Sequence, residues 1–168
     1  MIIQDEEKLS IRCEDVGVEE GSLLLKKLSG ILEPTGGIGL AANQIGILKR
    51  ACVIKLPDQT MVGLLNPKVI ELKIPFVMKN EGCLSFPDEY IETLRFAQVK
   101  VEDLLAPEGR VFTGITAVIA QHEIDHLNGI TMYRRQIKNL DPNEKCACGS
   151  NKPLKLCCGI LMRKNKPI

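Results

Sequence analysis

The chain has 168 residues, of which 45% are apolar and 26% charged, as expected for one soluble domain with room for a small appendage. No stretch reaches the length of a membrane span, and the acidic segment 1–7 lacks the features of an export signal. The seven cysteines are an odd number, which argues against a disulfide framework. We therefore expect a cytoplasmic protein without a membrane partner, and we take it to be a monomer.

Charge is distributed unevenly along the chain. Residues 1–140 carry 16 Lys and Arg against 19 Asp and Glu, a net charge of −3, whereas residues 141–168 carry six against two, a net charge of +4. A basic segment on a slightly acidic body is typical of a terminus that meets an anionic partner. A solvated terminus without a partner explains the same charges equally well.

The first half of the chain predicts one helix and a pair of strands. Leucines recur near a 3.6-residue period in 19–32, which predicts a helix that Pro34 and the following glycines end. The glycine-rich segment 37–44 fits neither a helix interior nor a packed strand. Residues 51–56 and 61–65 are expected to form short strands around a Pro-Asp turn.

The second half predicts further strands and then a long helix. Segments 67–72 and 76–78 are weak strand candidates, whereas apolar and polar residues alternate clearly in 96–102, and 110–113 is expected to pair back after a turn. A second helix is predicted over 115–128, ending at the glycine that follows. This order favours an α+β fold with a mainly antiparallel sheet around that helix.

Two histidines on the second predicted helix form a candidate metal site. His122 and His126 are four residues apart, so both imidazoles lie on one helical face and can bind a single metal ion. Glu123 lies about 100° around the helix, where it could act as general base for a water held by the metal. A chance match on an ordinary helix is the alternative. It is disfavoured because the face is apolar and burying two histidines there without a partner would be costly.

A catalytic site of this kind needs a third protein ligand. The chain has no other histidine, so a Cys, Asp or Glu must supply it. The metzincin pattern would place a histidine at position 132, which is Met132, and only Asp141 and Glu144 follow as carboxylates. The remaining candidate lies upstream, in segment 81–85, which contains Cys83.

Three motifs together resemble those of the peptide deformylase family. They are Gly-Ile-Gly-Leu-Ala-Ala-Asn-Gln at 37–44, Glu-Gly-Cys-Leu-Ser at 81–85 and Gln-His-Glu-Ile-Asp-His-Leu at 121–127. Their order is that of the family, and the resemblance covers roughly residues 10–138. It implies a peptide deformylase-like fold, in which antiparallel sheets surround a central metal-binding helix.

The resemblance assigns the metal ligands. It implies that Cys83, His122 and His126 bind one divalent metal in the active site. Family members use ferrous iron in the cell and tolerate zinc, nickel or cobalt. A thiolate donates more charge than an imidazole and tunes the Lewis acidity of the metal.

The resemblance also implies a reaction and its catalytic groups. The expected substrates are N-formylmethionyl nascent polypeptides, whose formyl group is hydrolysed by metal-activated water and released as formate. Glu123 is the expected general base. The Gln44 side-chain amide and the Leu84 backbone N–H are the expected donors to the developing oxyanion. Alternatively, the side-chain amide of Gln44 only holds the loop segment 37–42 in place.

Substrate binding is expected along glycine-rich backbone and in an apolar pocket. The family binds its peptide as an extra strand, and the matching positions here are Ile38, Gly39 and Gly82. The methionine side chain needs an unbranched apolar pocket, for which the candidates are Ile38, Ile115, Val118 and Ile119. Each of these four could equally be plain core.

Several residues near the motifs are expected to have structural roles. Glu81 is predicted to orient the loop that carries Cys83, with Arg95 as a candidate ion-pair partner. Cys13 and Cys52 are expected to be small buried residues. The family's usual C-terminal helix is replaced here by a cysteine-rich tail, and Asn43 stands where many members have proline.

Four cysteines in the tail suggest a second metal site. Cys146, Cys148, Cys157 and Cys158 suit a tetrahedral structural zinc ion, with disulfides as the disfavoured alternative. The sequence around them resembles the SEC-C motif, the zinc module of the translocase ATPase SecA. We expect a catalytic domain at 1–140 and a zinc-binding tail at 141–168, which could recruit the enzyme to ribosomes or to a protein partner.

Two other functions fit parts of this pattern. The same centre could belong to another metal amidase or a general peptidase. A degenerate deformylase body could also serve as a ribosome or chaperone adaptor through its tail. The intact set of catalytic residues disfavours the adaptor, because a site that has lost its activity has no chemical need for these residues.

Overall fold

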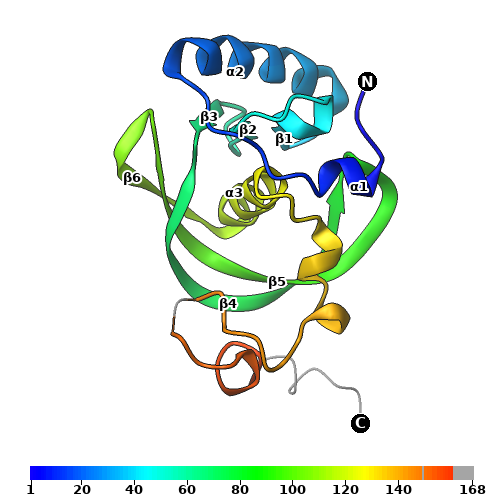
Figure 1. Cartoon of the computed structure of the whole chain (residues 1–168), viewed down its shortest axis with the longest axis vertical. Helices are drawn as coiled ribbons and strands as arrows, with labels where there is room; N and C mark the ends of the chain where they lie inside the picture. The colour runs from blue at the N-terminus through cyan, green and yellow to red at the C-terminus, as the bar shows by residue number, and fades with distance from the viewer. Residues whose placement is uncertain (149, 161–168) are drawn as a thin grey trace.

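The computed structural model describes residues 1–148 and 150–160. Within these residues, a pair of three-stranded antiparallel sheets encloses a central helix (Figure 1). The elements are α1 (Glu6–Leu9), α2 (Val18–Leu32), β1 (Gly39–Ala41), β2 (Ala51–Lys55), β3 (Met61–Leu65), β4 (Lys68–Cys83), β5 (Phe86–Asp103), β6 (Ala106–Thr113) and α3 (Gly114–Leu127). One sheet has the order β1-β2-β3 and the other β4-β5-β6. The predicted α+β, antiparallel fold is confirmed.

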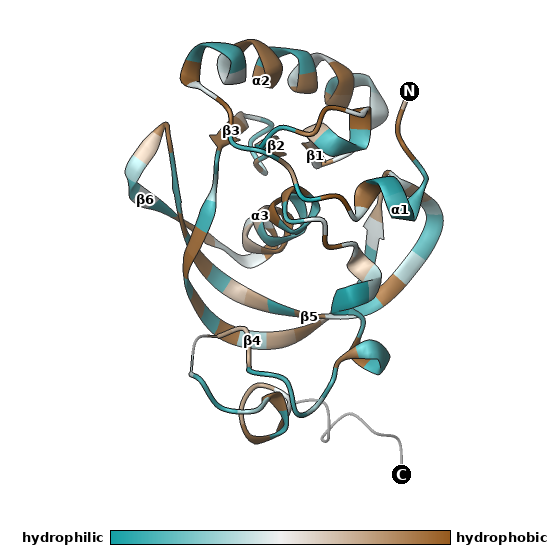
Figure 2. Ribbon diagram, in the orientation of Figure 1, coloured by the Kyte–Doolittle hydropathy of each residue, from teal (hydrophilic) through white to brown (hydrophobic). Residues whose placement is uncertain are grey.

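Helix α2 packs on the sheet β1-β2-β3 through one apolar stripe. Leu24, Leu28 and Leu32 are buried at intervals of four residues, so they lie on one face of the helix. They share a core cluster with Leu40, Val53 and Leu65 of the strands. Figure 2 shows α2 lying along this sheet, with hydrophobic and hydrophilic bands alternating along its turns. The helix predicted at 19–32 is confirmed.

Helix α3 is buried on all sides. Every residue from Ala117 to Leu127 is buried, because both sheets pack against this helix (Figure 1). Gly129 follows it with φ of 70°, a left-handed conformation that favours glycine. A Cβ at Gly129 would also collide with the backbone of Ser10. The helix therefore ends where the sequence predicts.

The strands β4 and β5 are much longer than predicted. The two weak candidates 67–72 and 76–78 are one strand, and the strand predicted at 96–102 begins at Phe86. Shifts in register between Met78 and Cys83 interrupt the pairing, with Asn80 in a left-handed conformation. Such bulges break the alternation of apolar residues from which a strand is predicted, and they redirect side chains near a site.

The sheet β4-β5-β6 is covered on both faces near its middle. The four consecutive residues 93–96 are all buried, which a sheet with one wet face would not allow. Helix α3 lies on one side, and the C-terminal tail lies on the other (Figure 1). Cys146, Leu154 and Cys158 of the tail belong to the same buried cluster as side chains of β5. Among the described residues, no helix is long and apolar enough to span a membrane.

Candidate metal centre

Three potential metal ligands converge where the end of β4 meets α3. The Sγ atom of Cys83 lies 3.2 Å from Nε2 of His126. One ligand atom from each of Cys83, His122 and His126 lies within 4.8 Å of the others. The imidazole rings of the two histidines lie 4.9 Å apart, edge to face. The structure thus brings the three sequence-predicted ligands together from two elements that are distant in the chain.

The carboxylate of Glu81 contacts one of these histidines. It lies 2.7 Å from Nδ1 of His122 and accepts hydrogen bonds from Thr93 and from Arg95. Burial opposes its ionisation, but Arg95 and His122 together hold the pKa of Glu81 well below its usual range. The contact leaves Nε2 of His122 free to face a metal. The predicted pairing of Glu81 with Arg95 is confirmed.

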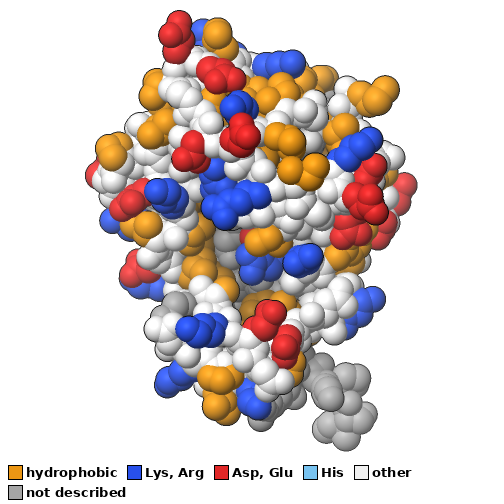
Figure 3. Space-filling model, viewed as in Figure 1, with side chains coloured by type: hydrophobic (Ala, Val, Ile, Leu, Met, Phe, Trp, Pro, Cys, Tyr) orange, Lys and Arg blue, Asp and Glu red, His pale blue; other side chains and the backbone are white. Residues whose placement is uncertain are grey.

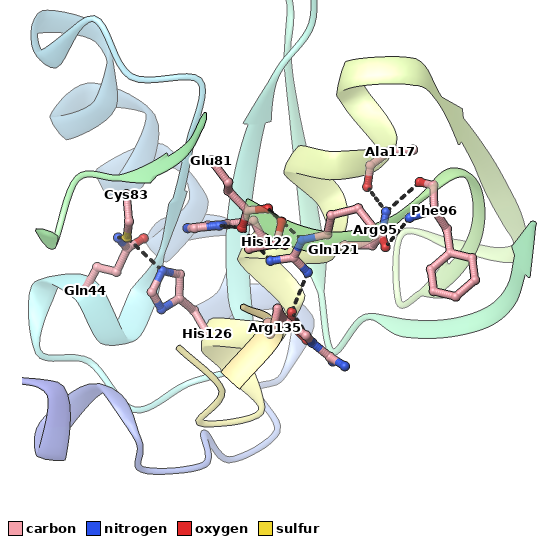
Figure 4. Close-up of polar contacts among 12 residues, drawn as sticks. Gln44, Glu81, Cys83, Arg95, Phe96, Ala117, Gln121, His122, His126 and Arg135 are labelled. Carbon is pink, nitrogen blue, oxygen red and sulfur yellow. Dashed lines mark hydrogen bonds and ion pairs between the residues drawn. The ribbon is translucent and has the colours of Figure 1, made fainter. Parts of the chain in front are cut away.

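The ion-pair network continues beyond what the sequence analysis identified. Arg95 is 2% exposed and also donates to Asp125 at 2.6 Å. Asp125 accepts two further hydrogen bonds from Arg135. Figure 4 shows Arg95 between Glu81 and Arg135, beside the metal ligands. The signal for Asp125 was available, since it lies three residues after His122 on the inward face, where a carboxylate needs a cation.

Glu123 is buried beside the three ligands. It is 4% exposed, and its Oε2 atom has no hydrogen-bond partner among the described residues. Burial raises the pKa of Glu123 to about 7, with Glu81 adding to the effect of burial. Its side chain lines a cavity of about 550 Å³ that also reaches Cys83 and His122. A carboxylate with a free oxygen at this position can accept a proton from a group in the cavity.

Gln44 presents its amide nitrogen toward the thiol. Its Oε1 atom accepts from the N–H of Ala41 at 2.9 Å, which fixes the orientation of the amide. Nε2 then donates to Ser85 at 3.1 Å and lies 3.6 Å from Sγ of Cys83. Ser85 is fully buried, and sequence reasoning gave it no role. Its place in the motif was the available signal, because it comes two residues after a metal ligand.

The predicted substrate residues all line this cavity. The walls contain Ile38, Gly39, Gly82, Leu84, Ile115, Val118 and Ile119. Val118 and Ile119 are buried, whereas Ile38 and Ile115 are about half exposed. The first pair therefore belongs to the floor of the cavity and the second pair to its rim.

Glycine at position 39 is required by the approach of Glu123. A Cβ added to Gly39 would collide with the carboxylate of Glu123 and come within 2.8 Å of Ile119. Strand β1 therefore passes directly against the acid, and only glycine fits there.

The donor set fits a divalent metal. A thiol and two imidazoles are the ligands of borderline-soft cations such as ferrous iron, zinc, nickel and cobalt. Burial and the neighbouring His122 lower the pKa of His126 well below its usual range, so its ring is neutral and able to ligate. Burial opposes a charge on His122, but Cys83 and Glu81 raise the pKa of His122. The negative groups around His122 thus favour positive charge at this cluster.

The four tail cysteines form a second group of potential ligands. The Sγ atoms of Cys146, Cys148, Cys157 and Cys158 all lie within 4.8 Å of one another. Backbone hydrogen bonds hold the segment that carries them, from Cys146 to Lys152 and from Leu154 to Glu144. None of the seven cysteines is in a disulfide in the described chain, and Cys13 and Cys52 are buried as predicted.

Comparison with known proteins identifies the family. The family model described as polypeptide deformylase matches residues 1–143. The chain is 34% identical to a peptide deformylase of Synechocystis over 67% of its length, which spans 64% of that relative. It is 36% identical to the peptide deformylase of Roseiflexus castenholzii, over 81% of the chain and 85% of the relative. A class I type b peptide deformylase structure from Acinetobacter baumannii superposes with a TM-score of 0.72 at 33% identity, over 80% of this chain and 96% of that one. The chain therefore belongs to the polypeptide deformylase family of metal-dependent enzymes.

Proposed function

We propose that this protein removes the N-terminal formyl group from the formyl-methionine of nascent polypeptides and releases formate. The observation that carries the proposal is the convergence of Cys83, His122 and His126 beside a buried Glu123 whose Oε2 atom is unpartnered in the described chain. All these residues except His126 line one cavity with the apolar positions expected for a methionine side chain. The family membership supports the same activity.

The metal site would hold one divalent cation through Cys83, His122 and His126. A cation there would polarise both the formyl carbonyl and the attacking water. We propose ferrous iron as the native metal, with zinc, nickel and cobalt as substitutes that the same donors accept. Metal analysis of protein purified without air distinguishes them.

The other groups handle protons and charge. Glu123 takes a proton from the attacking water and delivers it to the departing amine. The amide nitrogen of Gln44 and the backbone N–H of Leu84 stabilise the oxygen on which negative charge develops. Support for the first donor comes from the hydrogen bond that fixes the Gln44 amide through Ala41. The peptide lies along Ile38, Gly39 and Gly82.

One assay separates this proposal from its alternatives. The metal-loaded protein, kept anaerobic with iron or prepared with nickel, is given formyl-Met-Ala-Ser, acetyl-Met-Ala-Ser and a longer peptide without a formyl group. Release of formate from the first substrate alone is the expected result. Cleavage inside the longer peptide would identify a general peptidase, and no turnover of any substrate would favour the adaptor.

Replacement of Gly39 by Ala is expected to lower kcat/KM for formyl-Met-Ala-Ser by about tenfold or more. The new methyl group must displace the carboxylate of Glu123 or strand β1, and small displacements of catalytic groups cost one to two orders of magnitude. Gly30→Ala is the matched control, because a Cβ at Gly30 meets nothing within 4 Å. Equal activity of the two variants would show that Glu123 tolerates the displacement.

We propose further that the tail holds a structural zinc ion through Cys146, Cys148, Cys157 and Cys158. Four thiols whose Sγ atoms lie within 4.8 Å of one another suit a tetrahedral zinc ion, and zinc binding would contribute folding free energy. The proposal includes a division into a catalytic domain at 1–140 and a SEC-C-like tail at 141–168. The likeness of the tail sequence to the SEC-C motif supports it.

Replacement of Cys146 by Ser is expected to reduce the metal content from two ions per chain to one. The lost ion is the tail zinc, so metal bound by Cys83 and turnover per bound active-site metal should persist. Elemental analysis of the purified protein measures this. Cys13→Ala is the matched control, since Cys13 is buried away from both clusters. Retention of two ions by the Cys146 variant would contradict the zinc proposal.

We propose, as the role of this tail, that it brings the enzyme to ribosomes. The support is its net positive charge, part of which lies on the exposed Lys152 and the partly exposed Lys155. The double variant Lys152→Gln/Lys155→Gln should co-sediment less with ribosomes than the wild type. Lys26→Gln/Lys27→Gln, which removes two exposed charges from α2, should not. Equal co-sedimentation of the two variants would refute recruitment by the tail lysines.

A further inference from the structure

A second cavity of about 570 Å³ lies next to the ion-pair network, separate from the substrate cavity. Five basic side chains line it, from Arg12, Arg50, Lys68, Arg95 and Arg135. The acidic side chains that line it come from Asp15 and Asp125. Figure 3 looks onto this side of the molecule, where basic side chains gather around a hollow near the middle of the face. None of these residues contacts the metal or the substrate in the proposed deformylation, although Arg95 holds Glu81 against His122.

Most of the charges around this cavity are neutralised by ion pairs. Arg95 pairs with Glu81, which approaches from the side of the substrate cavity. Arg135 pairs with Asp125 at 2.5 Å, and Arg50 faces Asp15 at 3.5 Å. Counting these three acids against the five basic residues leaves two positive charges.

The two remaining charges belong to Arg12 and Lys68. Both are exposed, and neither forms an ion pair within residues 1–148 and 150–160. The positive charge of Arg12 also lowers the pKa of Arg50, after the larger effect of burial. Arg12 and Arg50 are therefore like charges that repel each other at this cavity. An anion between them would remove this repulsion.

Arg50 is held in a fixed orientation in the wall of this cavity. Its guanidinium is held by the carbonyl oxygens of Leu127 and Pro67 and by the side chain of Asn128. These partners are neutral, and the single acid near it, Asp15, is exposed and approaches only Nε. Arg50 therefore has a fixed position, and one hydrogen of its Nη2 atom has no acceptor among these contacts, which suits a preformed anion site.

We propose that this cavity binds a compact dianion of the phosphate-monoester class. Two uncompensated positive charges match two negative charges, and the guanidinium of Arg12, which has no ion pair in the described residues, matches the oxygens of a tetrahedral anion. The cavity has the volume of a small-molecule site. A phosphodiester carries only one charge per phosphate, so a nucleic-acid backbone fits the charge count less well.

One ion pair would separate such an anion from the metal centre. Arg95 lines this cavity, whereas its partner Glu81 lines the substrate cavity and contacts His122. The salt bridge between Arg95 and Glu81 therefore separates the two cavities. The binding itself needs no metal chemistry, and it can be measured independently of deformylation.

Calorimetric titration of the metal-loaded protein with inorganic phosphate at pH 8 and constant ionic strength tests the proposal. Phosphate and sulfate should bind, whereas chloride at the same ionic strength should not. Glycerol phosphate, a monoester dianion, should bind like phosphate, and the monoanion dimethyl phosphate should bind more weakly. No binding of phosphate, or equal binding of the two esters, would overturn the proposal.

Two double variants locate the site. Arg12→Gln/Lys68→Gln should raise the Kd for phosphate by roughly tenfold or more, because it removes both uncompensated charges. Lys26→Gln/Lys27→Gln changes the net charge by the same amount on the distant helix α2 and should leave the Kd unchanged. Both pairs are exposed, so both variants are expected to fold. Equal affinity of the two variants would place phosphate elsewhere, for example on the active-site metal, and would refute the assignment.

Discussion

Replacement of Glu123 by Gln is expected to lower kcat/KM for formyl-Met-Ala-Ser by about 10²–10⁴-fold, the usual contribution of a general base. Gln has nearly the same shape as Glu, so α3 and the three metal ligands should stay in place. What is lost is the ability to accept a proton at Oε2, the buried atom that has no partner in the described chain. Metal content should therefore remain at the wild-type value while turnover falls.

Metal analysis and formate release measured on the same sample make this result specific. A variant that lost its metal would be inactive for another reason, so only inactive protein with full metal content supports Glu123 as base. Glu92→Gln is the matched control, because Glu92 is an exposed carboxylate on β5. Activity of the Glu123 variant within threefold of the wild type would exclude the proposed proton transfer.

Replacement of Arg95 by Met is expected to cost about 3–5 kcal/mol of folding free energy. Arg95 is fully buried and pairs with both Glu81 and Asp125. Its removal leaves two buried carboxylates with less compensation. For a chain of this length the loss corresponds to a fall in Tm of roughly 6–20 °C.

The effect of the Arg95 variant should also reach the metal. Without its partner, Glu81 loses the interaction that fixes its contact with Nδ1 of His122, so the affinity for metal should fall as well. Arg134→Met, an exposed neighbour of the network, should change stability by no more than about 0.5 kcal/mol. A loss below about 1 kcal/mol for the Arg95 variant would show that solvent or a rearranged Arg135 replaces it.

The helices and the ligand set could be predicted because their signals are local. The four-residue spacing of His122 and His126 places them on one face of any helix, and Gly129 marks its end. Because the chain has no other histidine, the third ligand was predicted within segment 81–85. In the structure, Cys83 of this segment lies next to His126. Residue type and spacing gave the two histidines and the segment, whereas the choice of Cys83 within it followed from the resemblance to the peptide deformylase motifs.

The long strands and the charge network could not be predicted in the same way. Bulges around Asn80 hide the alternation of β4, and burial of residues 93–96 on both faces removes it from β5. The pairing of Asp125 with Arg95 and Arg135 joins three segments whose approach depends on the completed fold. The second cavity is likewise invisible in the sequence, because its basic residues are spread from position 12 to position 135.

The packing of the tail against β4 and β5 affects how this protein can be dissected. A chain that stops at Leu140 would lose Cys146, Leu154 and Cys158 from the cluster they share with β5, and it would expose apolar surface to water. Poor solubility of such a fragment would then be mistaken for a requirement of the tail in ribosome binding or catalysis. The tail differs from the rest of the chain in composition, but it packs against the sheet. Its roles are therefore better separated by point substitutions than by truncation.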